Sequence, residues 1–176
     1  QTAGVDQLLR DGVERLQALP GVERATATCC VPLEGGYGLP FRIVGRPLEK
    51  GPFHGGGAWL TVSSGYFDVF KIPIKRGRAF TDRDDSLAPA VVIINEAMAR
   101  KYWPNEDPVG KRITFEGPQQ NPRWREIVGI VGHVKHGNLE GGIRIQEVRF
   151  DFSRRSGGSG RITASRHDIV RHGSIE

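Results

Sequence analysis

The stretch VVIINEAMARKYWPNEDPVGKRI, residues 91–113, restricts the fold of this chain more than any other. Residues 91–94 are four consecutive β-branched residues, which favours a strand that is buried on both faces. Asn95 is a preferred N-cap residue, and Glu96 places a negative charge in the first turn of a helix. A proline ends that helix. The stretch therefore predicts a buried strand, a capped helix, a turn and a further strand at 111–115.

Polar residues at the end of a buried strand are often functional, so Asn95 and Glu96 are candidate catalytic residues. A nucleophilic mechanism would need a Ser, His or Cys beside them, and none stands near in the sequence. Each polar residue of this stretch also has a structural explanation as a cap, a turn or a helix end. We therefore interpret Asn95 as a helix cap and not as an active-site residue.

Hydrophobic periodicity predicts a second helix near the N-terminus. Apolar residues recur at steps of three and four over residues 5–19, which places one apolar stripe on a helix. The stripe consists of Val5, Leu8, Leu9, Val13, Leu16 and Leu19. Pro20 and Gly21 end the helix, and the β-branched and small residues at 22–30 predict a strand directly after it.

The middle of the chain is expected to be rich in turns, because the sequence has 24 Gly and 11 Pro. Further strands are predicted at residues 41–44, 59–62, 72–74, 124–134 and 145–153. The segment GPFHGGGAW is interpreted as a flexible connector. Its glycine triplet could cradle a phosphate only between a strand and a helix, and neither is evident there.

Three more local predictions concern caps, turns and order. Ser63 or Ser64 is expected to cap a short helical turn whose aromatic residues fill the core. The triplet at 76–78 is expected to turn the chain. The residues after Ser153 are poorly patterned, contain a Ser/Gly linker and are predicted to be disordered.

Asp82, Asp84 and Asp85 form an acidic segment that could bind a cation. A calcium-binding EF-hand loop needs a Gly and a later Glu at fixed spacing, and both are missing here. Arg78 and Arg83 can neutralise the carboxylates instead. We expect a solvated acidic loop or a capped helical turn without a metal.

The histidines and cysteines do not predict a site either. His133 and His136 have H-x-x-H spacing, but positions three apart on a strand face opposite sides, and a third zinc ligand is not apparent. Cys29 and Cys30 are neighbours, which strains any disulfide between them, and a C-x-x-C pair is absent. We interpret them as small residues at a strand end. The sequence thus predicts no catalytic, cofactor-binding or metal-binding residue.

The net charge of +5 and the pI near 9.6 permit an anionic partner. Lys and Arg are scattered between acidic residues, as in KRGRAFTDRDD, so no dense basic patch is predicted. No segment approaches the roughly 20 apolar residues of a membrane-spanning helix, and we expect a soluble chain. The absence of an initial Met and of a signal-peptide pattern indicates a mature or excised segment, or targeting information outside it.

Five segments follow one another in an order that is specific. They are LPGVERATAT, FRIVGRP, VSSGYFDVFKIPIKRGRAFTDRD, VVIINEAMARKYWPNEDPVGKRI and WREIVGIVGHVKHGNLE. Together they resemble the MacB-like periplasmic core domain, the extracytoplasmic domain of permeases of the macrolide-exporter class of ABC transporters. The likeness is greatest to the single-component permeases common in acidobacteria, and it covers roughly residues 5 to 150.

The resemblance implies an α+β fold of two lobes, with a porter-like β-α-β lobe and an inserted β-rich lobe. On that template residues 1–35 would begin the porter-like lobe and residues 36–142 would form the inserted lobe. Residues 143–176 would hold the returning strand and a degenerate or truncated tail. His133 stands where many members have Asp, and the rest of the second porter unit is missing, as in a truncated gene, a frameshift or an excised segment.

The resemblance also implies a non-catalytic role on the periplasmic side of the bacterial inner membrane. The domain would couple ATP-driven motion to substrate efflux or to partner proteins. Its partners would be a second permease copy and a cytoplasmic ATPase, with a periplasmic adaptor as a further candidate, and no nucleic acid is expected. The exported compound and the oligomeric state stay open.

Two rival functions stay open from the residues themselves. One is a basic nucleic-acid-binding module that uses Arg144, Arg149, Arg154, Arg155, Arg161 and Arg166. The other is a hydrolase that uses His133, His136 or Asp82, for which no triad or dyad is evident.

Overall fold

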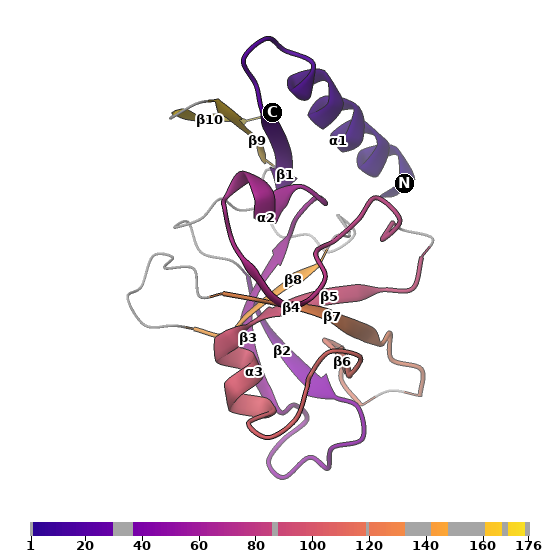
Figure 1. Cartoon of the computed structure of the whole chain (residues 1–176). Helices are drawn as coiled ribbons and strands as arrows, with labels where there is room; N and C mark the ends of the chain where they lie inside the picture. The colour runs from indigo at the N-terminus through magenta and orange to yellow at the C-terminus, as the bar shows by residue number, and fades with distance from the viewer. Residues whose placement is uncertain are drawn as a thin grey trace.

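The computed structural model describes residues 2–29, 37–85, 88–118, 120–132, 142–147, 161–166 and 169–174. These residues form two sheets and three helices, an α+β fold dominated by its sheets (Figure 1). The elements, in chain order, are α1 (Thr2–Gln17), β1 (Arg24–Thr28), β2 (Tyr37–Ile43), β3 (Gly55–Thr61), α2 (Tyr66–Val69), β4 (Ile74–Gly77), β5 (Val91–Asn95), α3 (Glu96–Tyr102), β6 (Arg112–Thr114), β7 (Arg125–Val131), β8 (Arg144–Glu147), β9 (Arg161–Arg166) and β10 (Ile169–Ser174).

The larger sheet has seven strands in the order β4-β7-β5-β8-β3-β2-β6, and β6 also pairs with β7. Because β6 pairs with β2 and with the first residues of β7, the sheet closes on itself. The strand β4 pairs with the last residues of β7. Two glycines permit this crowded pairing. A Cβ atom on Gly77 would lie 2.2 Å from the Val128 carbonyl oxygen, and one on Gly129 would lie 2.3 Å from the Arg78 carbonyl oxygen.

The central strand β5 is buried on both faces, as its β-branched run predicts. Val92 and Ile94 enter one hydrophobic cluster, which also receives Met98 and Trp103 from α3 and its C-cap. Ile93 enters a second cluster with Tyr66 and Phe67 of α2. Successive strand residues point to opposite faces, so a run without polar residues needs a core on each side.

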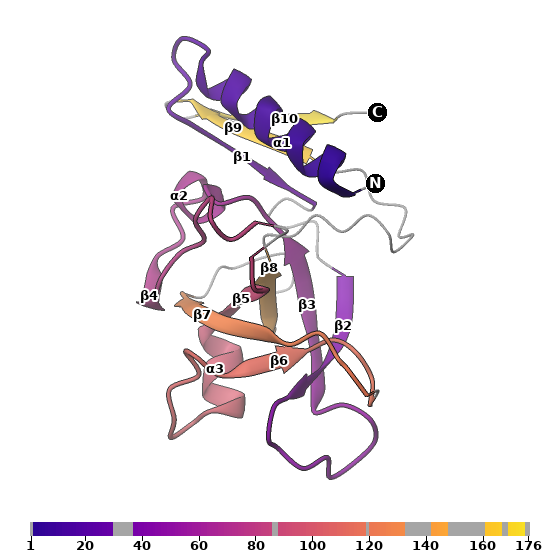
Figure 2. The ribbon, with the colours of Figure 1, turned by 90° about the vertical axis from the view of Figure 1, so that its right-hand side faces the viewer.

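The smaller sheet has three strands in the order β1-β9-β10, all antiparallel, with α1 packed against it (Figure 2). The predicted helix is present, but its apolar stripe is only partly covered. Leu9 is buried against Ala27, with Val13 beside it, whereas Leu8 is 61% exposed and Leu19 is 52% exposed.

The glycine triplet is wrongly predicted as a flexible connector, because residues 55–57 form the first half of β3. Strand propensity disfavours glycine, but packing requires it at two of the three positions. A Cβ atom on Gly55 would lie 2.1 Å from the Tyr102 hydroxyl oxygen, and one on Gly57 would lie 2.7 Å from the Ile143 side chain. The missing side chains let α3 and the segment before β8 approach the strand.

Three other local predictions are also wrong. The N-cap of α2 is Gly65, with no side-chain cap, because the hydroxyl groups of Ser63 and Ser64 bond elsewhere. Residues 76 and 77 continue β4 and do not form the predicted turn. The tail contains β9, which pairs with β1, and β10, which pairs with β9, so backbone pairing supplies order that its side-chain pattern does not indicate.

The predicted division at residues 35 and 142 stays a prediction. Residues 2–28 and 161–174 contribute to the three-stranded sheet and α1, whereas strands between 37 and 147 form the seven-stranded sheet. The returning strand β8 pairs with β3 and β5 inside the larger sheet. The chain thus begins and ends in the smaller sheet, and its middle builds the larger one.

Candidate functional site: the junction between the two sheets

The two sheets are joined by backbone pairing between residues 27–29 and residues 61–63. The Cys29 amide donates to the Thr61 carbonyl oxygen at 3.0 Å, and the Ser63 amide donates to the Ala27 carbonyl oxygen at 2.8 Å. Thr28 and Val62 form an antiparallel bridge between these two bonds. The end of β3 therefore leaves the larger sheet and runs on as a neighbour of β1.

The Ser63 side chain adds hydrogen-bonding contacts at this junction. Its hydroxyl oxygen accepts a hydrogen bond from the Ala27 amide at 3.0 Å and lies 2.7 Å from the Thr26 hydroxyl oxygen. Thr26 is fully buried, so its hydroxyl needs such a partner. The Thr61 amide also donates to the Cys29 sulfur at 3.3 Å. A single serine thus satisfies groups from two consecutive residues of β1.

The helix α2 extends the junction on its exposed side. Arg24 of β1 forms a 2.9 Å ion pair with Asp68 of α2, with both side chains well exposed. Lys71, just after α2, has φ +51°, a conformation that glycine adopts more readily. The helix ends there: the Lys71 amide donates to the Asp68 carbonyl oxygen, and the Ile72 amide donates to the Phe67 carbonyl oxygen.

A buried ion pair lies next to the junction, at the end of β8. Arg125 Nε donates to Glu147 Oε1 at 2.9 Å, and the side chains are only 11% and 3% exposed. The guanidinium also lies over the Phe115 ring, 4.8 Å from its centroid. The Glu147 carbonyl oxygen accepts from the Val62 amide, so the pair belongs to the strand that touches the junction. Fixing two charges here favours one register of β7 and β8.

The acidic segment is organised by hydrogen bonds to Asp84. Arg78 donates to both carboxylate oxygens of Asp84, at 2.7 and 2.8 Å, and the Thr81 amide and hydroxyl donate to the same carboxylate. Burial raises the pKa of Asp84, but the bonds from Arg78 and Thr81 outweigh it and hold that pKa below its usual value. The expected neutralisation by Arg78 is thus present, while Arg83 forms no ion pair among the described residues.

Asn95 caps α3, as the sequence predicts. Its side-chain oxygen accepts from the Met98 amide at 3.0 Å and from the Arg144 amide at 3.2 Å, while its side-chain nitrogen donates to the Gly142 carbonyl oxygen at 2.8 Å. The side chain is enclosed by the core, since Asn95 is only 2% exposed. All of these bonds join β5 to α3 and to β8, which explains Asn95 as a structural residue.

Only some of the remaining candidate residues lie within the described part of the chain. His133 and His136 lie outside the described residues, as do Cys30, Arg149, Arg154 and Arg155. Asp82 accepts a hydrogen bond from Ser64, and Asp85 accepts one from the Ala88 amide. Within the described ranges, no group of three or more His, Cys, Asp or Glu side chains could hold a metal ion. Arg144 is half-buried on β8, and burial lowers the pKa of its guanidinium, against an opposing effect of Tyr66.

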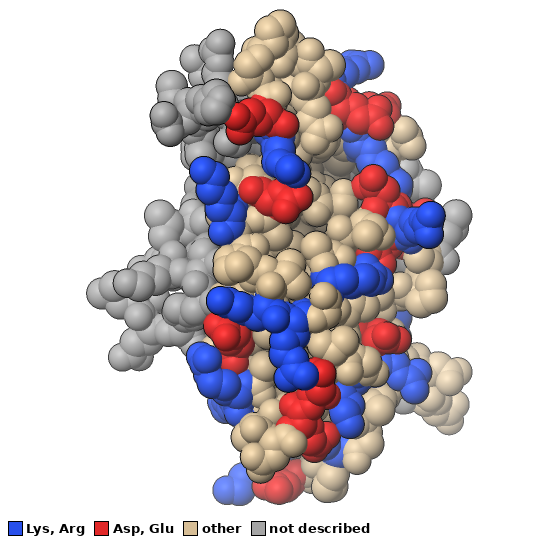
Figure 3. Space-filling model, in the orientation of Figure 1, with Lys and Arg blue, Asp and Glu red and all other residues tan. Residues whose placement is uncertain are grey.

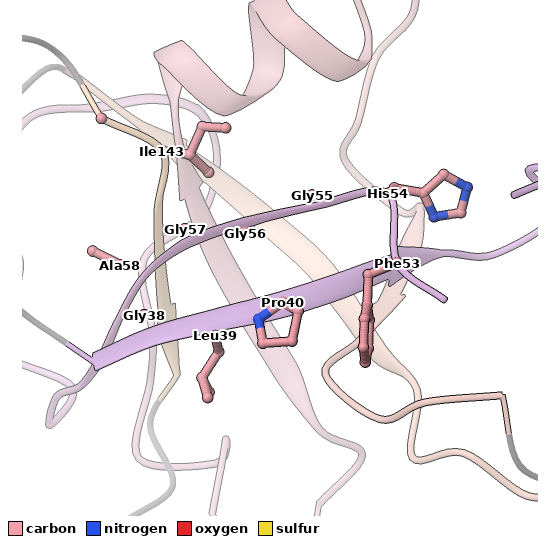
Figure 4. A pocket seen from close by; sticks show the side chains of 11 residues that line it. Gly38, Leu39, Pro40, Phe53, His54, Gly55, Gly56, Gly57, Ala58 and Ile143 are labelled. Carbon is pink, nitrogen blue, oxygen red and sulfur yellow. The ribbon is translucent and has the colours of Figure 1, made fainter. Parts of the chain in front are cut away.

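A shallow groove of about 690 Å³ lies along β2 and β3 (Figure 4). Five of the eleven lining residues are glycines, and Phe53, His54 and Ile143 are among the larger side chains. None of these lining residues is Asp, Glu, Lys or Arg. Elsewhere on the surface, positive and negative side chains are interspersed on the face that Figure 3 shows.

Sequence reasoning missed the residues that build the junction. Ser63 stands directly before Ser64 and a run of aromatic residues, so it resembles a helix cap in sequence. Glu147 stands in a segment that alternates apolar and polar residues, so it indicates an exposed position unless the strand is buried and a partner neutralises the carboxylate. Only the pairing of β7 and β8 with β5 between them shows that Arg125 is that partner.

Comparison with solved structures defines the class of this fold. The periplasmic region of MacB from Actinobacillus actinomycetemcomitans superposes with a TM-score of 0.62, at 18% identity, over 92% of this chain and 66% of that chain. The extracellular domain of the ABC-type transporter YknZ from Gram-positive bacteria gives a TM-score of 0.58, at 22% identity, over 91% of this chain and 73% of that chain. The fold is therefore that of extracytoplasmic domains of ABC-type transporters.

The sequence itself identifies the family. The family model of the MacB-like periplasmic core domain matches residues 5–152, so the chain belongs to that family. The macrolide export ATP-binding/permease protein MacB of Aggregatibacter actinomycetemcomitans is 32% identical over 76 residues, which are 43% of this chain and 11% of that protein. The chain thus spans about a tenth of this relative. Among the described residues, no helix is both long enough and apolar enough to cross a membrane.

Proposed function

We propose that this chain is the extracytoplasmic coupling module of an export permease and that it is not itself catalytic. Its two sheets would move as one body, carrying motion driven by a cytoplasmic ATPase to a substrate or to partners outside the membrane. Membership of the MacB-like periplasmic core domain family supports this role. The single observation that carries the mechanical part is the continuous backbone pairing of residues 27–29 with residues 61–63.

The geometry favours transmission of force over internal hinge motion. Backbone hydrogen bonds at 3.0 and 2.8 Å flank the bridge between Thr28 and Val62. The Ser63 hydroxyl adds two side-chain contacts to β1. The first and last described elements are α1, which packs on the smaller sheet, and β10, which is a strand of it (Figures 1 and 2). Membrane segments attached there would act first on the smaller sheet and through the junction on the larger one.

The same proposal implies particular partners. A second permease copy would bring two such modules together, and a periplasmic adaptor is a further candidate partner. The name of the relative MacB makes a macrolide the first compound to test, although this chain offers no observation that selects a substrate. The interspersed charges on the visible face do not favour a nucleic-acid-binding module.

The location is tested by sequencing the DNA on both sides of the codons for Gln1 and Glu176. A membrane-spanning segment directly upstream, with more downstream, is the expected result. A start codon and a stop codon flanking the chain directly would remove the mechanical basis of the proposal.

The coupling is tested by locking the junction in the permease that contains this chain. The double variant Thr26→Cys, Ser63→Cys should form a disulfide, because the two side-chain oxygens are 2.7 Å apart. The oxidised form should then export a macrolide at the same rate per ATP hydrolysed as the unsubstituted permease. The matched variant Thr26→Val, Ser63→Ala should export less per ATP. Loss of export on oxidation, with ATP hydrolysis unchanged, would show that the two sheets must move apart.

A further inference from the structure

A loop of residues 44–53 leaves the end of β2 and returns to the sheet through His54. In Figures 1 and 2 this loop lies at the end of the larger sheet remote from the smaller one. Gly45 and Gly51 turn the chain within it, at φ +73° and +74°. The pairing of β2 with β3 ends at Phe41 and Gly55, so the neck of the loop lies beyond the last paired residues.

The His54 ring closes this neck with two hydrogen bonds. Its Nδ1 atom accepts from the Ile43 amide at 3.1 Å, and its Nε2 atom lies 3.2 Å from the Pro47 carbonyl oxygen. An amide nitrogen can only donate and a carbonyl oxygen can only accept. The two partners therefore select the neutral tautomer with its proton on Nε2. In Figure 4 the ring stands at the end of the glycine strip of β3.

We propose that His54 is an acid-sensitive latch that fastens the 44–53 loop when neutral and releases its β2 side when protonated. An imidazolium ion carries a proton on Nδ1 and cannot accept from the Ile43 amide. That amide belongs to a residue that is 4% exposed, so it would lose its partner in a nearly buried position. The bond from Nε2 to Pro47 survives protonation, so the loop would stay attached at one point.

The charged groups around the latch come from the loop, β2 and α3. Arg46 is directed to α3, with its guanidinium over the Trp103 ring and 4.0 Å from Glu106, while Glu49 and Lys50 are exposed on the loop. Arg42 of β2 donates to the Gly117 carbonyl oxygen, and the Tyr102 hydroxyl lies over Gly55. Arg42 and Arg46 thus contact other partners, and the contacts of the His54 ring that close the neck are its two hydrogen bonds.

Protonation of His54 would loosen the neck of the loop without unfolding the sheet. Arg46 still holds the loop to the end of α3, and the His54 amide still donates to the Phe41 carbonyl oxygen at 2.9 Å. The change is therefore confined to the neck between Ile43 and Pro47. This inference concerns the chain alone and does not depend on the export function.

The test uses NMR of the 176-residue chain with ¹⁵N labelling. Ring spectra at pH 8 should show the Nε2-protonated tautomer of His54. Between about pH 8 and pH 5, where histidine side chains change charge, the Ile43 amide should lose roughly fivefold to tenfold in exchange protection. Residues 44–47 should become more mobile over the same range.

Two variants separate the latch from general acid effects. His54→Gln keeps an acceptor and a donor on one side chain but does not titrate, so its loop should not respond to pH. His136→Gln should leave the response as in the wild type. An Nδ1-protonated tautomer at pH 8, an Ile43 amide with constant protection, or a pH response that persists in His54→Gln would each overturn the proposal.

Discussion

Compared with the three-stranded sheet, the seven-stranded sheet is held by a much larger core. Two hydrophobic clusters fill it, one on each side of β5, and it closes on itself through β6 and β7. Among the described residues, the hydrophobic cluster of the three-stranded sheet contains Leu9 and Ala27, Leu8 and Leu19 are largely exposed, and further contacts come from the junction. The difference indicates that the larger sheet is the stable unit and the smaller one depends on it.

The largest expected effect comes from breaking the buried ion pair of the larger sheet. Arg125→Met would leave Glu147 charged and only 3% exposed, at a cost of about 3–5 kcal/mol in the free energy of unfolding. Denaturant unfolding would measure it, and both sheets should unfold together. The double variant Arg125→Met, Glu147→Leu is the control and should recover most of the loss. No recovery would mean that the cost comes from the lost stacking on Phe115.

Equivalent truncations in the two regions sharpen the comparison directly. Ile94→Ala in the closed sheet should cost about 3 kcal/mol, because the side chain is completely buried in a large cluster. Leu9→Ala on α1 should cost only about 1 kcal/mol, since it packs against few neighbours. Thermal or denaturant unfolding would measure both. Equal costs would contradict the view that the smaller sheet is the weaker region.

The Arg78–Asp84 pair gives the larger region a pH dependence. The pKa of Asp84 is lower in the folded chain than its ordinary value, so its contribution is complete above about pH 4 and is lost as the pH falls through the folded value. Asp84→Asn should cost about 1 kcal/mol at pH 7. Unfolding measured from pH 7 to pH 2 should show this difference shrinking as acid is added. A difference that grows at low pH would contradict the sign.

The smallest effect is expected at Lys71, between the two regions. Its φ of +51° strains a residue with a Cβ atom, and glycine removes that strain. Lys71→Gly should therefore stabilise the chain by about 0.5 kcal/mol, while Lys71→Ala should not. A precise comparison of denaturation midpoints would detect this. Destabilisation by glycine would indicate that the lysine side chain makes a contact of its own.

The sequence predicts the larger sheet better than the smaller one, and the reason is physical. The β-branched run of β5 and the cap at Asn95 carry local signals, because burial on two faces and a free helix terminus each demand particular residues. The strand nature of the glycine triplet could not be predicted, since it depends on Tyr102 and Ile143, which are distant in the chain. The strand β9 depends in the same way on a distant partner, β1, and β10 pairs with β9.

The candidate site was harder to predict than the fold. Ser63 carries no mark that separates it from a helix cap, because its partners Thr26 and Ala27 belong to another sheet. The Arg78–Asp84 pairing could be expected, since the residues are close in sequence and opposite in charge. Tertiary packing sets the contacts across the junction, and local sequence patterns do not reveal them.

The pairing of β1 with β9 has a consequence for the time course of folding. Arg24 lies opposite Ser165, so a strand near the beginning of the chain waits for one near its end. Contacts between such distant segments form late, because a long loop must close before they gain anything. While the chain emerges, β1 would have to rest on residues 61–63, which arrive much earlier. The junction would then be the first partner of β1, and it stays in place once the last strands are made.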